Sequence, residues 1–201
     1  MKKPGERGRI GLRIKDEGLR SQISFLLRTE AIEAEDISSM EGVEGLYKVV
    51  ITDEKPRVER PGILVVKEGF QPKDLFKAIR VLERLPRRID SLTIGVDPGE
   101  KIGSAALCSN ELIDFHTSHE VSSLIQWIEW LLGLVKPPSV RVRVGRGDRW
   151  REIVEAVKEK GWEGVKVEVV DEKETTKGFS PWDGWDLGKD VRAAIRIALK
   201  V

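Results

Sequence analysis

The chain has 201 residues, of which 40% are hydrophobic and 34% are charged, and its formal net charge is +1. This length suffices for one large domain or two modest domains with buried cores. No apolar run approaches the roughly 18–20 residues that a membrane span needs, and the basic start of the sequence lacks the apolar core of a signal peptide. We therefore expect a soluble, cytoplasmic protein that does not enter a membrane.

The composition also restricts the chemistry of the protein. Cys108 is the only cysteine, which excludes an intrachain disulfide and a cysteine-based zinc site. High charge with few Asn and Gln residues is typical of proteins from thermophiles, where ion-pair networks are favoured and labile amides are avoided. Because the net charge is close to zero, a nucleic-acid site must be made by local clusters of residues.

Segment 82–91 predicts a boundary between two domains. A helical pattern ends at Leu85, Pro86 blocks its continuation, and a strand pattern follows. We therefore predict a small α/β domain of unknown role over 1–88, suited to docking a partner or substrate, and a second domain over 89–201.

The first half alternates strand and helix patterns, which indicates a small α/β layer. Strands are expected at 9–16, 46–53 and 62–69, and helices at 17–30 and 71–85.

Three polar residues give the first half a faint resemblance to response-regulator receivers. "IKDEGLR" contains Asp16, "VVITD" ends at Asp53, and "VVKEGFQPKDL" contains Lys67. The resemblance would imply phosphotransfer. However, only eight residues separate Asp53 from Gly62, so a full receiver's fourth strand and helix do not fit. The simpler interpretation is that these residues are polar strand ends of a docking domain.

The second half has a strand order that predicts a mixed sheet. Strands are expected at 92–97, 102–108, 111–117, 140–145 and 165–171, and helices near 120–134, 149–160 and 188–200. The links between the first three strands are too short for crossovers, so these strands form an antiparallel meander. A helix separates the last two, which predicts a parallel pair with a right-handed crossover.

This order and its motifs resemble the RuvC and YqgF nucleases of the ribonuclease H-like superfamily, over roughly 92–200. "IGVDPGEKIGSAAL" is similar to their opening strand pair, and "VRVGRGD" to the end of the fourth strand. "VEVVDEKETTKG" is similar to the fifth-strand motif, with Lys173 where arginine is usual, and "LGKDVRAAIRIAL" to the final helix. The expected fold class is α/β, a ribonuclease H-like mixed five-stranded sheet with flanking helices plus the smaller N-terminal domain.

The resemblance implies that Asp97, Glu172 and Asp190 are catalytic and hold Mg²⁺ or Mn²⁺. Hydrolysis of a phosphodiester needs a hydroxide nucleophile and a stabilised leaving alkoxide, which two Mg²⁺ ions about 3.5–4 Å apart supply from carboxylate ligands. We expect Asp97 on the central strand, Glu172 at the end of the neighbouring fifth strand and Asp190 at the start of the last helix to converge. Asp148 or Asp171 is the alternative to Glu172.

Each of these acids also has a structural interpretation. Asp97 is well placed to initiate a turn, Asp190 to cap a helix, and Glu172 to lie at a solvated strand end. Likewise, Asp148 is a candidate cap for the helix that follows it.

The residues that would contact nucleic acid surround the acids in the predicted fold. They are Arg146, Arg149, Thr175, Thr176, Trp182 and Trp185. The arginines would grip phosphates and the threonines would orient the backbone. Bases stack on tryptophan for about 1–3 kcal/mol each, although aromatic residues in such loops more often close the edge of a core.

The sequence therefore predicts a metal-dependent nuclease, a hydrolase that acts on structured RNA or DNA such as precursor ribosomal RNA or branched DNA. A homodimer would suit junction cleavage, which needs two active sites. The alternative is a non-catalytic ribonuclease H-like scaffold that binds nucleic acid or protein. Lys173 and the additional first half favour that alternative.

Overall fold

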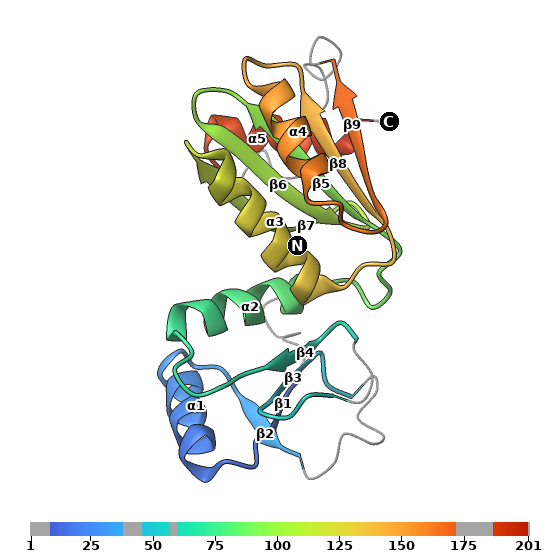
Figure 1. Cartoon of the computed structure of the whole chain (residues 1–201). Coiled ribbons are helices and arrows are strands. Elements are labelled where there is room, and N and C mark those ends of the chain that lie inside the picture. The colour runs from blue at the N-terminus through green and yellow to red at the C-terminus, as the bar shows by residue number, and fades with distance from the viewer. Residues whose placement is uncertain (1–8, 38–45, 57–59, 172–186, 201) are drawn as a thin grey trace. The chain divides into compact units, whose positions relative to one another are not determined.

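The chain divides into two compact units, Met1–Glu83 and Arg84–Val201, each with its own sheet (Figure 1). The computed structural model describes residues 9–37, 46–56, 60–171 and 187–200. The division falls five positions before the predicted boundary at residue 88, at the end of a helix.

The first unit contains a four-stranded parallel sheet in the order β2-β1-β3-β4. Its elements are β1 (Ile10–Arg13), α1 (Glu17–Thr29), β2 (Ala34–Asp36), β3 (Val49–Thr52), β4 (Ile63–Val65) and α2 (Pro72–Arg84). The three predicted strands form, although they are shorter than expected. Strand β2 was not predicted, because three residues with two acids carry no apolar alternation.

Helix α1 begins and packs as its sequence dictates. Leu19, Ile23 and Leu27 recur every four residues and are buried, so they form one apolar face. The Asp16 carboxylate accepts a hydrogen bond from the Leu19 amide at 2.7 Å and caps the helix. Asp16 therefore has a structural role at the end of β1.

The second unit contains the predicted mixed sheet, in the order β7-β6-β5-β8-β9. Its elements are β5 (Leu92–Pro98), β6 (Ile102–Cys108), β7 (Glu111–Ser118), α3 (Val121–Val135), β8 (Val140–Gly145), α4 (Trp150–Glu159), β9 (Val165–Val170) and α5 (Lys189–Leu199). Strands β5, β6 and β7 form the antiparallel meander, while β5–β8 and β8–β9 pair in parallel. This confirms the predicted five-stranded mixed sheet flanked by helices.

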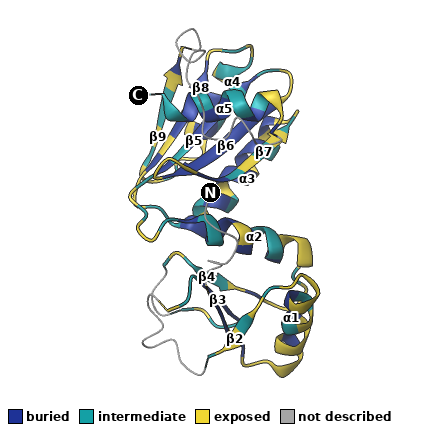
Figure 2. Cartoon of the chain, turned by 180° about the vertical axis from the view of Figure 1, so that it is seen from behind, coloured by how far each residue is buried: buried dark blue, intermediate teal, exposed yellow. Residues whose placement is uncertain are grey.

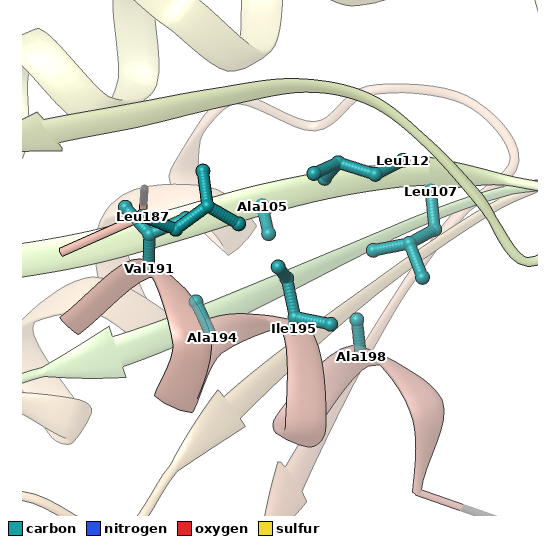
Figure 3. Packing of buried hydrophobic residues seen from close by; sticks show 8 residues of the cluster. All are labelled: Ala105, Leu107, Leu112, Leu187, Val191, Ala194, Ile195 and Ala198. Carbon is teal, nitrogen blue, oxygen red and sulfur yellow. The ribbon is translucent and has the colours of Figure 1, made fainter. Parts of the chain in front are cut away.

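Helix α5 packs on β5 and β6, whereas α3 packs on β6 and β7 and α4 on β8 and β9. All residues of β6 are buried, as Figure 2 shows for this strand. The apolar cluster beneath α5 joins the helix to β6 and β7 (Figure 3). It consists of Ala105, Leu107, Leu112, Leu187, Val191, Ala194, Ile195 and Ala198.

Small residues in the sheet allow α5 to approach very closely. A Cβ atom added to Gly95 would lie 2.0 Å from the Ala194 carbonyl oxygen and 2.6 Å from the Ala198 nitrogen. Only glycine fits there, since real Cβ atoms do not make such contacts. Gly95 therefore fixes the helix directly on the central strand.

None of the helices in the described part of the chain has the length and apolar character needed to cross a membrane.

Candidate functional site

Asp97 and Asp190 come together at one corner of the sheet in the second unit. Asp97 is paired with Gly103 across β5 and β6. A Cβ atom on Gly103 would lie 2.3 Å from the Asp190 carbonyl oxygen and 2.8 Å from the Asp190 Cβ. Because directly paired residues of antiparallel strands point to the same face, Asp97 and the first turn of α5 share one face of the sheet.

The alternation along β5 leads to the same conclusion. Gly95 faces α5, and Asp97 is two residues further along the strand, so its side chain is on the α5 side as well. Both Asp97 and Asp190 are half-buried. Residues 97 and 190 are far apart in sequence, and packing of α5 on glycines brings them to one place.

Asp190 lies in the first turn of α5 but does not cap it. The N-cap position of α5 is Gly188, two residues before Asp190, so the interpretation of Asp190 as the helix cap is wrong. A carboxylate in the first turn is stabilised by the positive end of the helix dipole.

The carboxyl ends of three parallel strands meet at this edge of the sheet (Figure 1). Arg146 directly follows β8, and its amide donates to the Val170 carbonyl at 3.1 Å, next to Asp171. Strand β8 separates β9 from β5. The expectation that the fifth strand neighbours the Asp97 strand is therefore wrong, and a ligand after β9 must reach across β8.

Several predicted site residues lie outside the described residues, and their predictions stay predictions. These are Glu172, Thr175, Thr176, Trp182 and Trp185. Over the described ranges, no three His, Cys, Asp or Glu side chains are close enough to hold a metal ion. The two alternatives to Glu172, Asp148 and Asp171, are both exposed.

Arg149 has a structural role at the same edge. Its guanidinium donates to both carboxylate oxygens of Glu152, at 2.9 and 3.0 Å, and to the His119 carbonyl at 2.6 Å. The Arg149 hydrogen bond lowers the pKa of Glu152. Arg149 also occupies the capping position of α4, so Asp148 does not cap that helix. Arg146, in contrast, is exposed.

Sequence reasoning missed the function of Arg143. Its side chain is only 13% exposed and its Nε donates to Glu168 at 2.9 Å. Its Nη1 donates to the Ala198 carbonyl at 2.8 Å and to the Lys200 carbonyl. Arg143 therefore donates hydrogen bonds to carbonyl groups that the carboxyl end of α5 leaves without a partner inside the helix. This is the helix that carries Asp190. Alternation along a strand gives the face on which Arg143 lies, but not the helix that covers it.

The acids of the first unit are held by the backbone. Asp53 Oδ2 accepts hydrogen bonds from the Lys15 and Asp16 amides, both at 2.9 Å. Burial raises the pKa of Asp53, but these hydrogen bonds outweigh it and the pKa is lowered overall. Asp53 thus joins the loops that follow β1 and β3, while Lys67 is exposed.

No protein-family model matches this chain, and no curated protein shows a significant sequence match to it. Its function must therefore be argued from its own residues.

Proposed function

We propose that the second unit is a metal-dependent nuclease that hydrolyses phosphodiester bonds in structured RNA or DNA. The observation that carries the proposal is the meeting of Asp97 and Asp190 on the α5 face of the sheet. Two carboxylates from distant parts of the chain repel each other at short range unless a cation joins them.

The oxygen ligands at this corner fit Mg²⁺. This ion is commonly bound by one or two carboxylates, with water and substrate phosphate completing the octahedron. Asp97 and Asp190 are the proposed ligands, and Glu172 is proposed as the third, from beyond the end of β9. When bound, the ion lowers the pKa of its water and stabilises the leaving alkoxide.

The remaining residues of the edge position the substrate in this proposal. Arg146 is exposed at the end of β8, at the same edge of the sheet, and in this proposal it donates to phosphate oxygens, for which the guanidinium fork is well suited. Thr175 or Thr176 orients the backbone, and Trp182 and Trp185 offer stacking surfaces. Nucleic acid is thus the proposed partner, a homodimer is the form suited to branched substrates, and the cytoplasm is the proposed location.

Cleavage assays test this proposal. The full chain is incubated with end-labelled structured RNA and branched DNA, with and without Mg²⁺, beside Asp97→Asn, Asp190→Asn and Glu155→Gln. Glu155 is an exposed carboxylate on α4 and serves as the matched control. We expect cutting that requires Mg²⁺, unchanged in Glu155→Gln and reduced by about 100-fold or more in both aspartate variants. Equal cutting by Asp97→Asn would contradict the assignment.

A non-catalytic scaffold is the second candidate, favoured by the structural use of Arg143 and Arg149. Calorimetric titration with Mn²⁺ separates the two. A nuclease centre should bind Mn²⁺ and lose the site in Asp190→Ala, whereas a scaffold should retain nucleic-acid binding with no such site.

A further inference from the structure

Strand β9 leaves one edge of the second unit's sheet open. Among the strands that the structure describes, β9 has β8 on one side and no strand on the other (Figure 1). An edge with unpaired backbone groups is a template for another strand, and proteins commonly protect it with proline, a bulge or lysine. Residues 165–170 contain no proline, and they pair with β8 in continuous register. Lysine is therefore the one protecting feature to examine in β9.

The hydrogen bonds between β8 and β9 show which residues point to the open edge. The Arg146 amide donates to the Val170 carbonyl at 3.1 Å, and the Val140 amide donates to the Gly164 carbonyl at 3.3 Å. In a parallel pair, alternate residues of a strand direct both backbone groups to the same neighbour. Even-numbered residues of β9 therefore bind β8, and the odd-numbered residues direct their N–H and C=O groups to the open edge. These are Val165, Val167 and Val169.

The side chains of β9 form an apolar row and a charged row. The three valines are half-buried or exposed, with Val169 38% exposed. Lys166 and Glu168 alternate with them and so lie on the other face of the sheet. There the Arg143 guanidinium, which also binds the end of α5, donates to Glu168 at 2.9 Å and orients its carboxylate.

We propose that two copies of the chain associate by antiparallel pairing of their β9 strands. The two-fold axis passes through Val167, so Val167 lies opposite its own copy and Val165 lies opposite Val169. These residues direct their backbone groups at each other, as the hydrogen-bonded pairs of an antiparallel ladder require. The valines of both copies then form one apolar row. The proposal names the surface of the homodimer considered above, and it does not depend on nuclease activity.

Charge selects this register. With the axis at Val167, Lys166 of each copy lies opposite Glu168 of the other, in non-hydrogen-bonded pairs whose side chains come close. Opposite charges in such positions stabilise a sheet, and like charges destabilise it. An axis at residue 166 or 168 would set lysine against lysine or glutamate against glutamate. Lys166, which alone would protect the edge, therefore favours this one pairing.

Strand β7, at the opposite edge of the sheet, is less suited to pairing. Its ladder with β6 shifts register between Ala106 and Leu107, which indicates a bulge. The Ile113 carbonyl accepts a hydrogen bond from Arg84 at 3.2 Å, so part of the β7 backbone is already bonded to a side chain. Phe115 on β7 is 41% exposed, and it provides a control for non-specific apolar association.

Sedimentation velocity of the full chain over about 5–500 µM tests the association. We expect a reversible monomer–dimer equilibrium with a Kd of about 100 µM or lower, since the interface of one strand pair is small. Lys166→Glu should weaken association about ten-fold or more, because carboxylates then oppose carboxylates. Lys158→Glu makes the same charge change at an exposed position of α4 and should leave the Kd unchanged, as should Phe115→Ser.

A mixture of two charge variants tests the register. Lys166→Glu and Glu168→Lys each set like charges against each other and should each associate about ten-fold more weakly than the natural chain. Their equimolar mixture should form a heterodimer at least about ten-fold tighter than either variant with itself, because every carboxylate then faces an ammonium group. The Tm shows that each variant is folded. If Glu168→Lys unfolds for want of its bond to Arg143, the exchange experiment below takes its place.

Amide hydrogen exchange followed by NMR locates the interface. The Val165 amide already donates to the Trp162 carbonyl at 3.4 Å, so the edge donors are the amides of Val167 and Val169. Their exchange should be about ten-fold slower at a concentration where about nine-tenths of the chains are dimeric. The amides of the even-numbered residues of β9, which face β8, should exchange at the same rate at all concentrations.

Four results would overturn the proposal. The first is a chain that stays monomeric at about 500 µM. The second is a dimer that Lys166→Glu leaves intact or that Phe115→Ser dissociates. The third is a mixture of two folded charge variants that associates no better than each alone. The fourth is a dimer in which the Val167 and Val169 amides exchange as fast as in the monomer. None of these results bears on phosphodiester cleavage, which is assayed separately.

Discussion

Gly103 lies directly beneath Asp190: a Cβ atom on the glycine would come within 2.3 Å of the aspartate's carbonyl oxygen. Asp97 is the strand partner of that glycine. The position of the first turn of α5 therefore depends on the absence of a side chain at residue 103. Stability of the second unit and geometry of the carboxylate pair are coupled through this contact.

Gly103→Ala should lower the free energy of unfolding by about 1–3 kcal/mol, since overpacked cores lose this much when they adjust. Gly95→Ala should cost at least as much, because its Cβ would come closer still to the backbone of α5, 2.0 Å from the Ala194 carbonyl oxygen. Urea denaturation followed by tryptophan fluorescence measures both, as all six tryptophans belong to the second half of the chain.

The matched control is Gly133→Ala on α3. Nothing lies within 4 Å of a Cβ there, and alanine favours a helix over glycine by about 0.5–1 kcal/mol. This variant should be more stable than the natural chain. A Gly103→Ala protein as stable as the natural chain would show that α5 is not held against β6 as described.

The sheet of the second unit was predictable because its signals are local. The apolar run of β6 ends at two residues with positive φ, Ser109 and Asn110, which form a tight hairpin. Short links dictated the meander, and a helix between β8 and β9 dictated their parallel pairing. In the first unit the strands are shorter than the sequence pattern predicted. The amides of Lys15 and Asp16, predicted within a strand, bind Asp53 instead.

The candidate site was only partly predictable. Sequence motifs placed Asp97 and Asp190 on their elements, but the close packing that joins them depends on α5 resting on Gly95 and Gly103. Arg143 binds Glu168 and the Ala198 carbonyl, and Arg149 binds the His119 carbonyl besides its near neighbour Glu152; Glu168, Ala198 and His119 are all 25 or more residues away in sequence. Strand alternation gives the face of a side chain but not what covers it.

Arg143→Met should destabilise the second unit by about 2–4 kcal/mol, because it leaves Glu168 and the last carbonyls of α5 without a charged donor. Arg143→Lys should recover only part of this loss, since an ammonium group lacks the planar fork. Arg141→Met is the control, as Arg141 lies on the same strand and is exposed. If the two methionine variants were equally stable, Arg143 would not anchor α5.

The Asp53 carboxyl should titrate below its ordinary value of 3.8. Burial disfavours its charge, but the amides of Asp16 and Lys15 stabilise it more, so the folded pKa is lowered. The stability that this group contributes is complete above pH 3.8, and it is lost as the pH falls through the lowered pKa. The measurement is the pH dependence of the Lys15 and Asp16 amide proton shifts by NMR.

Asp53→Asn is the reference for this titration. The amide oxygen still accepts hydrogen bonds but carries no charge, so the two amide shifts should lose their acid transition. A transition in the natural chain at or above pH 3.8 would contradict the hydrogen bonds described.

Cys108 should be unreactive in the folded protein and serve as a reporter of unfolding. It is completely buried at the end of β6, and burial raises the pKa of its thiol to about 11. The thiolate is the reactive form, so both its low abundance and its burial protect it. With one cysteine in the chain, a disulfide reagent such as DTNB labels at most one site per molecule.

The labelling rate at pH 8 should be at least about 1,000-fold slower in buffer than in denaturant, because the thiol is exposed only when the sheet opens. If the thiol is exposed only by global unfolding, the labelling rate of the folded protein follows the unfolded population. Gly103→Ala should then speed labelling by the same factor by which it raises the equilibrium constant for unfolding. Rapid labelling of the folded natural chain would mean that the end of β6 opens locally, independently of α5. Comparing the two rates therefore tells whether β6, the strand beneath Asp190, unfolds with the helix or before it.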